Sequence, residues 1–187
     1  HGRPALAWAV KLNWRGYRTW WASYGESGLA SDERPPAELL SAASTADHYV
    51  SSPLPRAFET AQHVSAGASI SVNNLFAEAP LPAPRIPFVR LKPKTWGVLS
   101  RISWRLGYSD SGESHVHAET RAQEAAAELA RLARGRKLVV MCGHGWFNRM
   151  VRGVLRAQGW RCVYDGGDSY WAWRRFAPPP GNTGSMQ

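Results

Sequence analysis

The feature that most restricts the fold is a short apolar segment with a helix-like segment on each side. Residues 137–142 read Lys-Leu-Val-Val-Met-Cys and are followed by the turn-forming Gly-His-Gly of residues 143–145. Residues 121–134 and 146–158 both carry apolar side chains at helical spacing. An apolar run of this length between two helices is typical of a buried strand in a parallel sheet.

A second unit of the same kind lies earlier in the chain. Residues 46–52 read as a strand, and residues 54–66 read as a helix opened by Pro53, because proline is favourable near the first helical position. Alternating strands and helices predict an α/β fold of three layers, in which a mainly parallel sheet has helices on both faces.

Length and composition predict one domain. The chain has 187 residues, of which 44% are hydrophobic and 20% charged, and this suits a single core. We expect the domain to span residues 1–176, with a hairpin over 161–176, and a flexible tail to follow at 177–187.

No apolar run approaches the roughly 20 residues of a membrane-spanning helix. Cys142 and Cys162 are too few for a disulfide framework, which favours a cytoplasmic location.

The charge balance predicts an anionic partner. Lysine and arginine together number 23, whereas aspartate and glutamate number 14. Aromatic residues alternate with Lys11, Arg15 and Arg18, which could form a stacking platform for single-stranded nucleic acid. No ribonucleoprotein-type motif or zinc-knuckle spacing accompanies them. We therefore expect no nucleic-acid partner and no membrane partner, and the sequence does not predict an oligomeric state.

The two strand-to-helix turns should form one site. The carboxyl ends of parallel strands line the ligand crevice in α/β proteins, so Ser52 and Arg56 should meet His144 at one edge of the sheet. Residues 79–93 contain five prolines and are unsuited to a helix or a central strand. We expect this proline-rich segment to be a loop or lid over that edge.

Four motifs occur in a recognisable order: His1-Gly2-Arg3-Pro4, then Ser-Ser-Pro-Leu-Pro-Arg-Ala at residues 51–57, then Glu78, then Gly-His-Gly at residues 143–145. They resemble the motifs of the histidine phosphatase superfamily, the phosphoglycerate mutase-like fold, and the resemblance implies that fold over nearly the whole chain. Members also carry an apolar strand and an arginine immediately before the first histidine. We expect such a strand to precede His1 in the natural protein and the given sequence to be truncated.

The residue types suit chemistry on a phosphate ester. The nonbridging oxygens need cationic donors, and Arg56 can supply a planar fork of them. Neutral imidazole is a nucleophile, so attack by His1 would give a phosphohistidine. His144 is expected to be a protonated donor to the phosphate, at the N-terminus of a helix.

Departure of the leaving group requires a proton. Glu78 occupies the position at which relatives carry their general acid, and it could later deprotonate the attacking water. Glu113 is the competing acid, although a capping or pocket-wall role suits it better. We favour Glu78.

Six further residues are candidates for substrate binding: Gly2, Ser52, Gly145, Arg85, Arg90 and Lys92. The first three flank the reactive groups, and the last three belong to the proline-rich segment. His115 and His117 with Glu119 form a weak metal-binding pattern, since alternate histidines share a face only on a strand and we expect this segment to enter a helix. We expect no metal and no cofactor.

These expectations combine into a phosphomonoester hydrolase that acts on a small phosphorylated substrate through a phosphohistidine intermediate. A phosphoglycerate mutase-type phosphoryl transfer is an alternative, which the shortness of the chain disfavours. A catalytically inactive module that binds phosphorylated ligands is another. No motif identifies the substrate.

Overall fold

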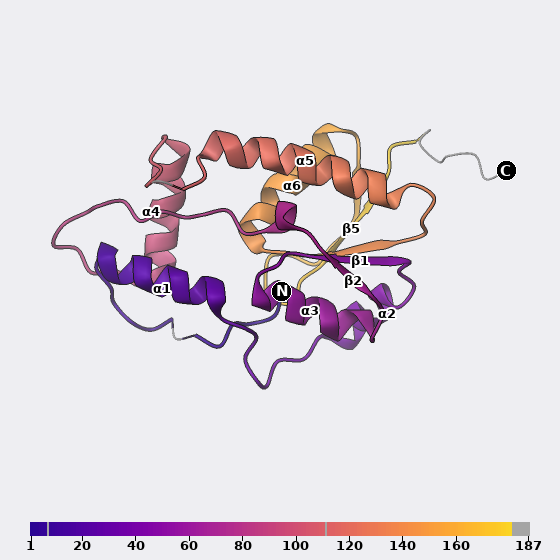
Figure 1. The fold of residues 1–187 in the computed structure, drawn as a ribbon, viewed down its shortest axis with the longest axis horizontal. Helices are drawn as coiled ribbons and strands as arrows, with labels where there is room; N and C mark the ends of the chain where they lie inside the picture. Colours follow the sequence, from indigo (N-terminus) through magenta and orange to yellow (C-terminus); the bar gives the residue numbers. More distant parts are fainter. Residues whose placement is uncertain (7, 111, 181–187) are drawn as a thin grey trace.

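The computed structural model describes residues 1–6, 8–110 and 112–180 (Figure 1). At its centre lie three parallel strands in the order β2-β1-β3. They are β1 (His48–Ser51), β2 (Ile70–Val72) and β3 (Val139–Cys142). β1 pairs with both neighbours. The parallel sheet expected from the two strand–helix units is confirmed.

Helices cover both faces of this sheet. In Figure 1, α2 (Ala37–Ala43) and α3 (Pro55–Ser65) lie below the strands, whereas α5 (His115–Ala133) and α6 (Gly145–Ala157) lie above them. The three-layer α/β architecture is therefore confirmed. No helix among the described residues is both long and apolar enough to cross a membrane.

The starts of two helices are set by local residues. Pro55, not Pro53, occupies the first turn of α3. α5 begins at His115, so the segment with His115 and His117 enters a helix as expected. The Ser114 side chain caps this helix by accepting a hydrogen bond from a backbone N–H of the first turn (3.2 Å). Ala118 is the only buried residue before 122 in α5, so the apolar spacing that marks a helix starts late.

The C-terminal hairpin is confirmed. β4 (Arg161–Asp165) and β5 (Arg174–Ala177) are antiparallel, and Arg161 pairs with Ala177. Ala177, predicted as the first residue of the tail, is thus part of the hairpin. Residues 178–180 have no regular secondary structure beyond a turn, and 181–187 lie outside the described residues.

The main core lies between β1, α5 and α6. A separate cluster of aromatic side chains holds together α1 (Trp14–Glu26) and α4 (Pro93–Arg105), at the left end of the molecule in Figure 1. Its fully or largely buried rings are Tyr17, Trp20, Tyr24 and Trp96. Trp8, Trp14 and Trp21 are partly buried against the same cluster, so the N-terminal aromatic residues mainly pack a core.

The proline-rich segment, which follows β2 and the short 3₁₀ helix Asn74–Phe76, is a loop as expected, but most of it is not a lid. Ala83, Ile86 and Leu91 pack against the core of α1 and α4. Leu12 and Leu91 exchange two backbone hydrogen bonds of 2.9 Å each. The apolar side chains between the prolines draw the segment onto these helices, so the expectation of a lid over the sheet edge is wrong beyond Pro80.

Replacing Trp96 by alanine should destabilise the protein strongly. Its ring is fully buried, and its Nε1 donates a 2.7 Å hydrogen bond to the Leu12 carbonyl. Loss of a buried tryptophan typically costs about 3–5 kcal/mol of unfolding free energy. Val98→Ala, at an exposed position of the same helix, should cost less than about 0.5 kcal/mol. Urea denaturation of the two variants tests this, and similar losses would contradict it.

Candidate active site

The register of the sheet brings the first two polar groups together. Ser51 of β1 pairs with Cys142 of β3, and the next backbone N–H, that of Ser52, donates to the Cys142 carbonyl (3.0 Å). His144 follows β3 in the same direction, and its Nε2 lies 2.8 Å from the Ser52 hydroxyl oxygen. Both side chains are fully buried. The expected convergence of the two turns is thus present.

The His1 ring lies beside that of His144, with 5.3 Å between the ring centroids. His1 Nδ1 lies 2.7 Å from the Gly2 carbonyl oxygen. Because a carbonyl only accepts hydrogen bonds, Nδ1 carries the proton and Nε2 keeps a free electron pair in the neutral ring. The backbone therefore selects the tautomer that a nucleophile at Nε2 requires.

Backbone contacts on both sides hold the His1-Gly2 segment in place. The His1 carbonyl accepts a hydrogen bond from the Trp171 N–H (3.2 Å), and the Gly2 N–H donates to the Thr60 hydroxyl of α3 (3.1 Å). A Cβ atom on Gly2 would overlap the Trp171 ring, so this position requires glycine.

Arg56 is 1% exposed and lies in the first turn of α3. Its guanidinium stacks over the Tyr24 ring at 4.0 Å, and one terminal nitrogen donates to the Tyr24 and Ser27 carbonyls at the end of α1. Burial lowers the pKa of Arg56. Among the described residues, its Nε has no hydrogen-bond partner. Arg56 is therefore anchored on α1 and keeps a buried donor for a ligand.

Without a ligand, the surroundings of His144 disfavour the cation that was expected from the sequence in the presence of phosphate. Burial, followed by the nearby positive charge of Arg56, holds its pKa well below the ordinary value of 6.5. Its Nδ1, like the Nε of Arg56, has no partner among the described residues. Buried polar atoms without partners cost free energy and are uncommon in folded proteins. Arg56 and His144 each keep one buried polar atom that a ligand could bind.

Glu78 lies at the N-terminus of α6. Its Oε1 accepts hydrogen bonds from the backbone N–H groups of Phe147 (2.9 Å) and Ala79 (3.1 Å). Burial raises the pKa of Glu78 and outweighs these hydrogen bonds, which lower it. Glu78 and Arg56 line one cavity of about 130 Å³. The other residues that line it are Trp21, Tyr24, Gly25, Leu54, Ala79 and Pro80.

Glu113 has a different position. Both of its oxygens accept hydrogen bonds of 2.7 Å from Arg121. Arg121 also donates to the Ala77 carbonyl (2.8 Å), directly before Glu78. This pair supports the backbone that carries Glu78, and Glu113 does not line its cavity. Sequence reasoning missed Arg121, although a charged residue next to the buried Ala122 was a usable signal.

The predicted substrate-binding residues divide into two groups. Gly2 and Ser52 lie in the site, and Gly145 is exposed as the first residue of α6. The other three have different surroundings. Arg85 pairs with Asp110 (2.9 Å), Arg90 donates to the Lys11 carbonyl (3.4 Å), and Lys92 lies exposed immediately before α4. Arg85 and Arg90 therefore interact with residues around α1 and α4, and neither they nor Lys92 line the cavity next to Glu78.

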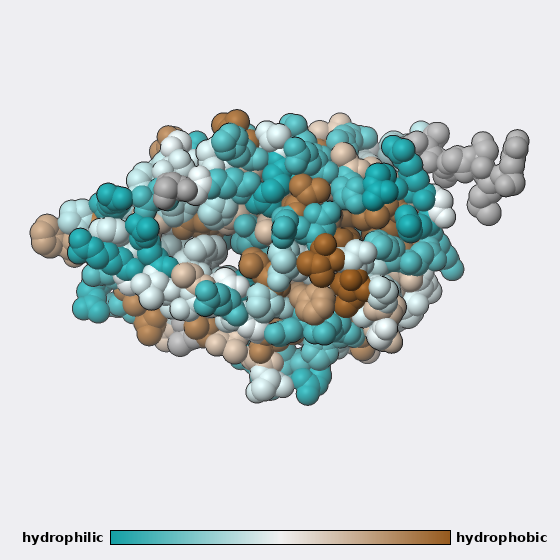
Figure 2. All heavy atoms as spheres, in the orientation of Figure 1, coloured by the Kyte–Doolittle hydropathy of each residue, from teal (hydrophilic) through white to brown (hydrophobic). Residues whose placement is uncertain are grey.

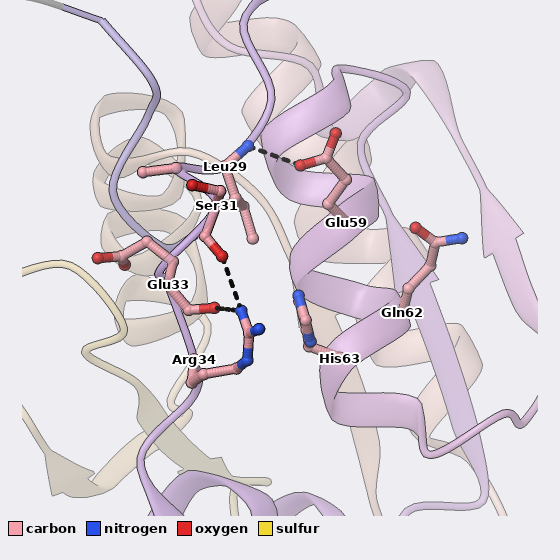
Figure 3. A pocket seen from close by; sticks show the side chains of 8 residues that line it. Leu29, Ser31, Glu33, Arg34, Glu59, Gln62 and His63 are labelled. Carbon is pink, nitrogen blue, oxygen red and sulfur yellow. Dashed lines mark hydrogen bonds between the residues drawn. The ribbon is translucent and has the colours of Figure 1, made fainter.

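A larger pocket of about 380 Å³ lies between α3 and the segment after α1 (Figure 3). His63 faces Arg34 across it, while Arg34 donates to the Glu33 and Ser31 carbonyls at 2.7 and 3.1 Å. Glu59 accepts a 2.6 Å hydrogen bond from the Leu29 N–H. The charged groups of this pocket have local partners, and none of the four proposed catalytic residues lines it.

The fold and this cluster define an α/β protein in which Arg56 and His144 lie directly beyond the carboxyl ends of two parallel strands, β1 and β3, with His1 beside His144. The chain belongs to the histidine phosphatase superfamily (branch 1), whose family model matches residues 26–161. The match includes Arg56, Glu78 and His144, whereas His1 and Gly2 lie before it. Among curated proteins, a sequence search finds no match.

Solved structures share the fold. A protein from a Mycobacterium tuberculosis open reading frame is 20% identical, with a TM-score of 0.55 over 95% of this chain and 92% of that one. A mycobacterial glucosyl-3-phosphoglycerate phosphatase is 18% identical, with a TM-score of 0.54 over 99% and 96%. A phosphoserine phosphatase mutant from Entamoeba histolytica, in complex with phosphoserine, is 16% identical, with a TM-score of 0.51 over 73% and 74%.

The environment of His144 predicts a loss of stability in acid. An imidazole in the unfolded chain has its ordinary pKa of 6.5, whereas the native pKa is lower. As the pH falls below 6.5, the unfolded state therefore binds more protons than the folded state does. The stabilisation that neutral His144 provides above pH 6.5 is then lost. From about pH 7 to about pH 5 the wild type should lose more unfolding free energy than His144→Asn.

Urea unfolding at both pH values measures this difference. Asparagine keeps a polar group next to Ser52, and His117→Asn, at an exposed position of α5, controls for the loss of an imidazole. Equal losses in the wild type and His144→Asn would show that His144 does not remain neutral in the folded protein.

Proposed function

We propose that the chain hydrolyses small phosphate monoesters through a phosphohistidine on His1. The observation that carries the proposal is the pairing of the His1 and His144 rings, with the His1 tautomer fixed by the Gly2 carbonyl. Family membership supports phosphatase activity at the level of the superfamily.

In the first step, the electron pair of His1 Nε2 forms a bond to phosphorus as the bond from phosphorus to the ester oxygen breaks. The nonbridging oxygens lie against Arg56 Nε and His144 Nδ1, which are among the buried atoms that have no partner in the described part of the chain. The dianion raises the pKa of His144, since a nearby negative charge favours the imidazolium. His144 thereby becomes the cationic donor that the chemistry needs.

Glu78 supplies the proton for the departing alkoxide. Its raised pKa favours the protonated acid, as this role demands. In the second step, ionised Glu78 removes a proton from water, which attacks phosphorus while the bond to Nε2 breaks and returns its electron pair to His1. The products are an alcohol and inorganic phosphate, and no metal or cofactor takes part.

The size of the cavity supports a small substrate. About 130 Å³ next to Glu78 and Arg56 suits a short organic group more than a polymer. Two neighbours in fold are phosphatases of phosphoserine and of a glucosyl-3-phosphoglycerate. A cytoplasmic location stays a prediction from the cysteine content.

The intermediate can be trapped. Labelled substrate should give a phosphoenzyme that is labile in acid and stable in base, as expected of a phosphoramidate on His1, and His1→Ala should not accumulate it. Quenched-flow labelling followed by peptide mapping measures this. Label on a serine or cysteine would exclude His1 as nucleophile, and a stable complex without turnover would favour a binding module.

The acid role of Glu78 predicts a substrate-dependent defect. Glu78→Gln should slow phosphorylation of the enzyme by an alkyl phosphate about a hundredfold or more. Nitrophenolate leaves without protonation, so phosphorylation by nitrophenyl phosphate should slow much less. Single-turnover rates are needed, because a base role in the second step affects both substrates equally.

Glu124→Gln, which removes an exposed carboxylate of α5, should leave both rates unchanged. Equal slowing of the two esters by Glu78→Gln would limit that residue to a structural role. The selective defect in Glu113→Gln would transfer the acid role to Glu113.

A further inference from the structure

The positive charge of the protein is concentrated in two segments. Residues 8–25 and 79–109 contain no aspartate or glutamate, and they contain nine basic residues: Lys11, Arg15, Arg18, Arg85, Arg90, Lys92, Lys94, Arg101 and Arg105. The rest of the chain has 14 basic and 14 acidic residues. The formal net charge of +9 therefore belongs entirely to these two segments.

The fold joins both segments into one body, which we call the basic lobe (residues 8–25 and 79–109). α1 packs on α4, and the backbone hydrogen bonds between Leu12 and Leu91 tie the N-terminal segment to the proline-rich loop. In Figure 1 the lobe forms the left end of the molecule. The charges that are distant in the sequence thus lie in one part of the molecule.

Most of these charges have no acidic partner. Arg18 and Arg85 pair with Asp110, next to the lobe, and Arg101 stacks over the Trp146 ring. The remaining six basic residues of the lobe form no ion pair with a described residue. All six are exposed: Lys11, Arg15, Arg90, Lys92, Lys94 and Arg105. An unneutralised field of this kind attracts anionic partners.

The lobe also exposes apolar side chains where folding provides no reason for them. Phe88 in the proline-rich loop is fully exposed (103%) and has a φ of 62°. This left-handed conformation is unfavourable for a bulky residue, and no burial offsets its cost. Val98 and Ile102 of α4, and Leu106 directly after its last residue, are also exposed and lie at spacings of four residues. Figure 2 shows mainly hydrophilic side chains at this end of the molecule, with a hydrophobic one at the extremity.

We propose that the basic lobe binds the surface of a bilayer that contains anionic lipids. Basic side chains would contact the headgroups, while Phe88 and the apolar stripe of α4 enter the boundary between headgroups and acyl chains. Unpaired basic side chains next to exposed apolar side chains favour a lipid surface over nucleic acid. Nucleic acid would be bound by exposed stacking rings, and Tyr17, Trp20 and Trp96 are buried. This differs from the expectation of no membrane partner, which considered only membrane-spanning segments.

Vesicle flotation tests the proposal without reference to enzymatic activity. The protein should float with vesicles of phosphatidylcholine and phosphatidylserine, and not with phosphatidylcholine alone. Added salt should weaken binding, because it screens the charges. Equal flotation with both vesicle types, or flotation with neither, would overturn the proposal. Preferential retention by a single-stranded oligonucleotide added in competition would replace the membrane with nucleic acid.

Two variants probe the two kinds of contact. Lys11→Gln combined with Lys94→Gln should lower the partition coefficient about 25-fold, at about fivefold for each charge near the surface. Phe88→Ser should lower it about tenfold, because the inserted ring is lost. Both changes are at exposed positions and should leave the thermal midpoint unchanged.

The matched control is Arg134→Gln combined with Lys137→Gln. It removes the same charge from the turn between α5 and β3, at the opposite end of the molecule (Figure 1). Binding by this control should stay within about twofold of the wild type, since its charges lie at the end of the molecule opposite the proposed contact with lipid and salt screens distant charges. An equal loss in the control would show that net charge alone attracts the protein, and would refute a specific binding surface.

Discussion

The parallel pairing of β1 with β3 is the constraint on which the site depends. Ser51 lies opposite Cys142, so the chain leaves both strands at the same edge, and Ser52 meets His144. A shift by one residue would turn every side chain of a strand to the other face and separate this pair. The helices α3 and α6 start directly beyond that edge, which places Arg56 and the backbone N–H groups that bind Glu78 beside it.

Arg56 connects this edge to the rest of the molecule. One guanidinium nitrogen holds carbonyl groups at the end of α1, and its charge lowers the pKa of His144. The position of α1 is therefore linked to the electrostatics of the site. Trp21, Tyr24 and Gly25, near the end of α1, line the cavity next to Glu78. The lobe that carries the net charge of the protein thus also forms one wall of the proposed site.

Short-range sequence patterns were enough to predict the strands, the helices that follow them and the edge of the sheet at which they meet. The apolar run at residues 137–142 and the convergence of Ser52 with His144 were both predictable, because parallel strands direct their carboxyl ends to one edge. The prolines of residues 79–93 showed that the chain is irregular there, but not which surface it packs on. The support that Arg121 gives to the segment before Glu78 depends on contacts distant in sequence, and burial, which no motif encodes, sets the protonation of His144.

In the proposed mechanism, the burial of His144 and Glu78 links substrate binding to the protonation of both side chains. His144 is neutral without a ligand, since desolvation and Arg56 both disfavour its charged form. Burial likewise favours the protonated form of Glu78. A phosphate dianion next to both groups would raise both pKa values, because its negative charge stabilises the imidazolium and repels the carboxylate. Substrate binding would therefore assemble the cationic donor and keep the general acid protonated. When phosphate leaves, both pKa values fall again and the site returns to the state that accepts the next dianion.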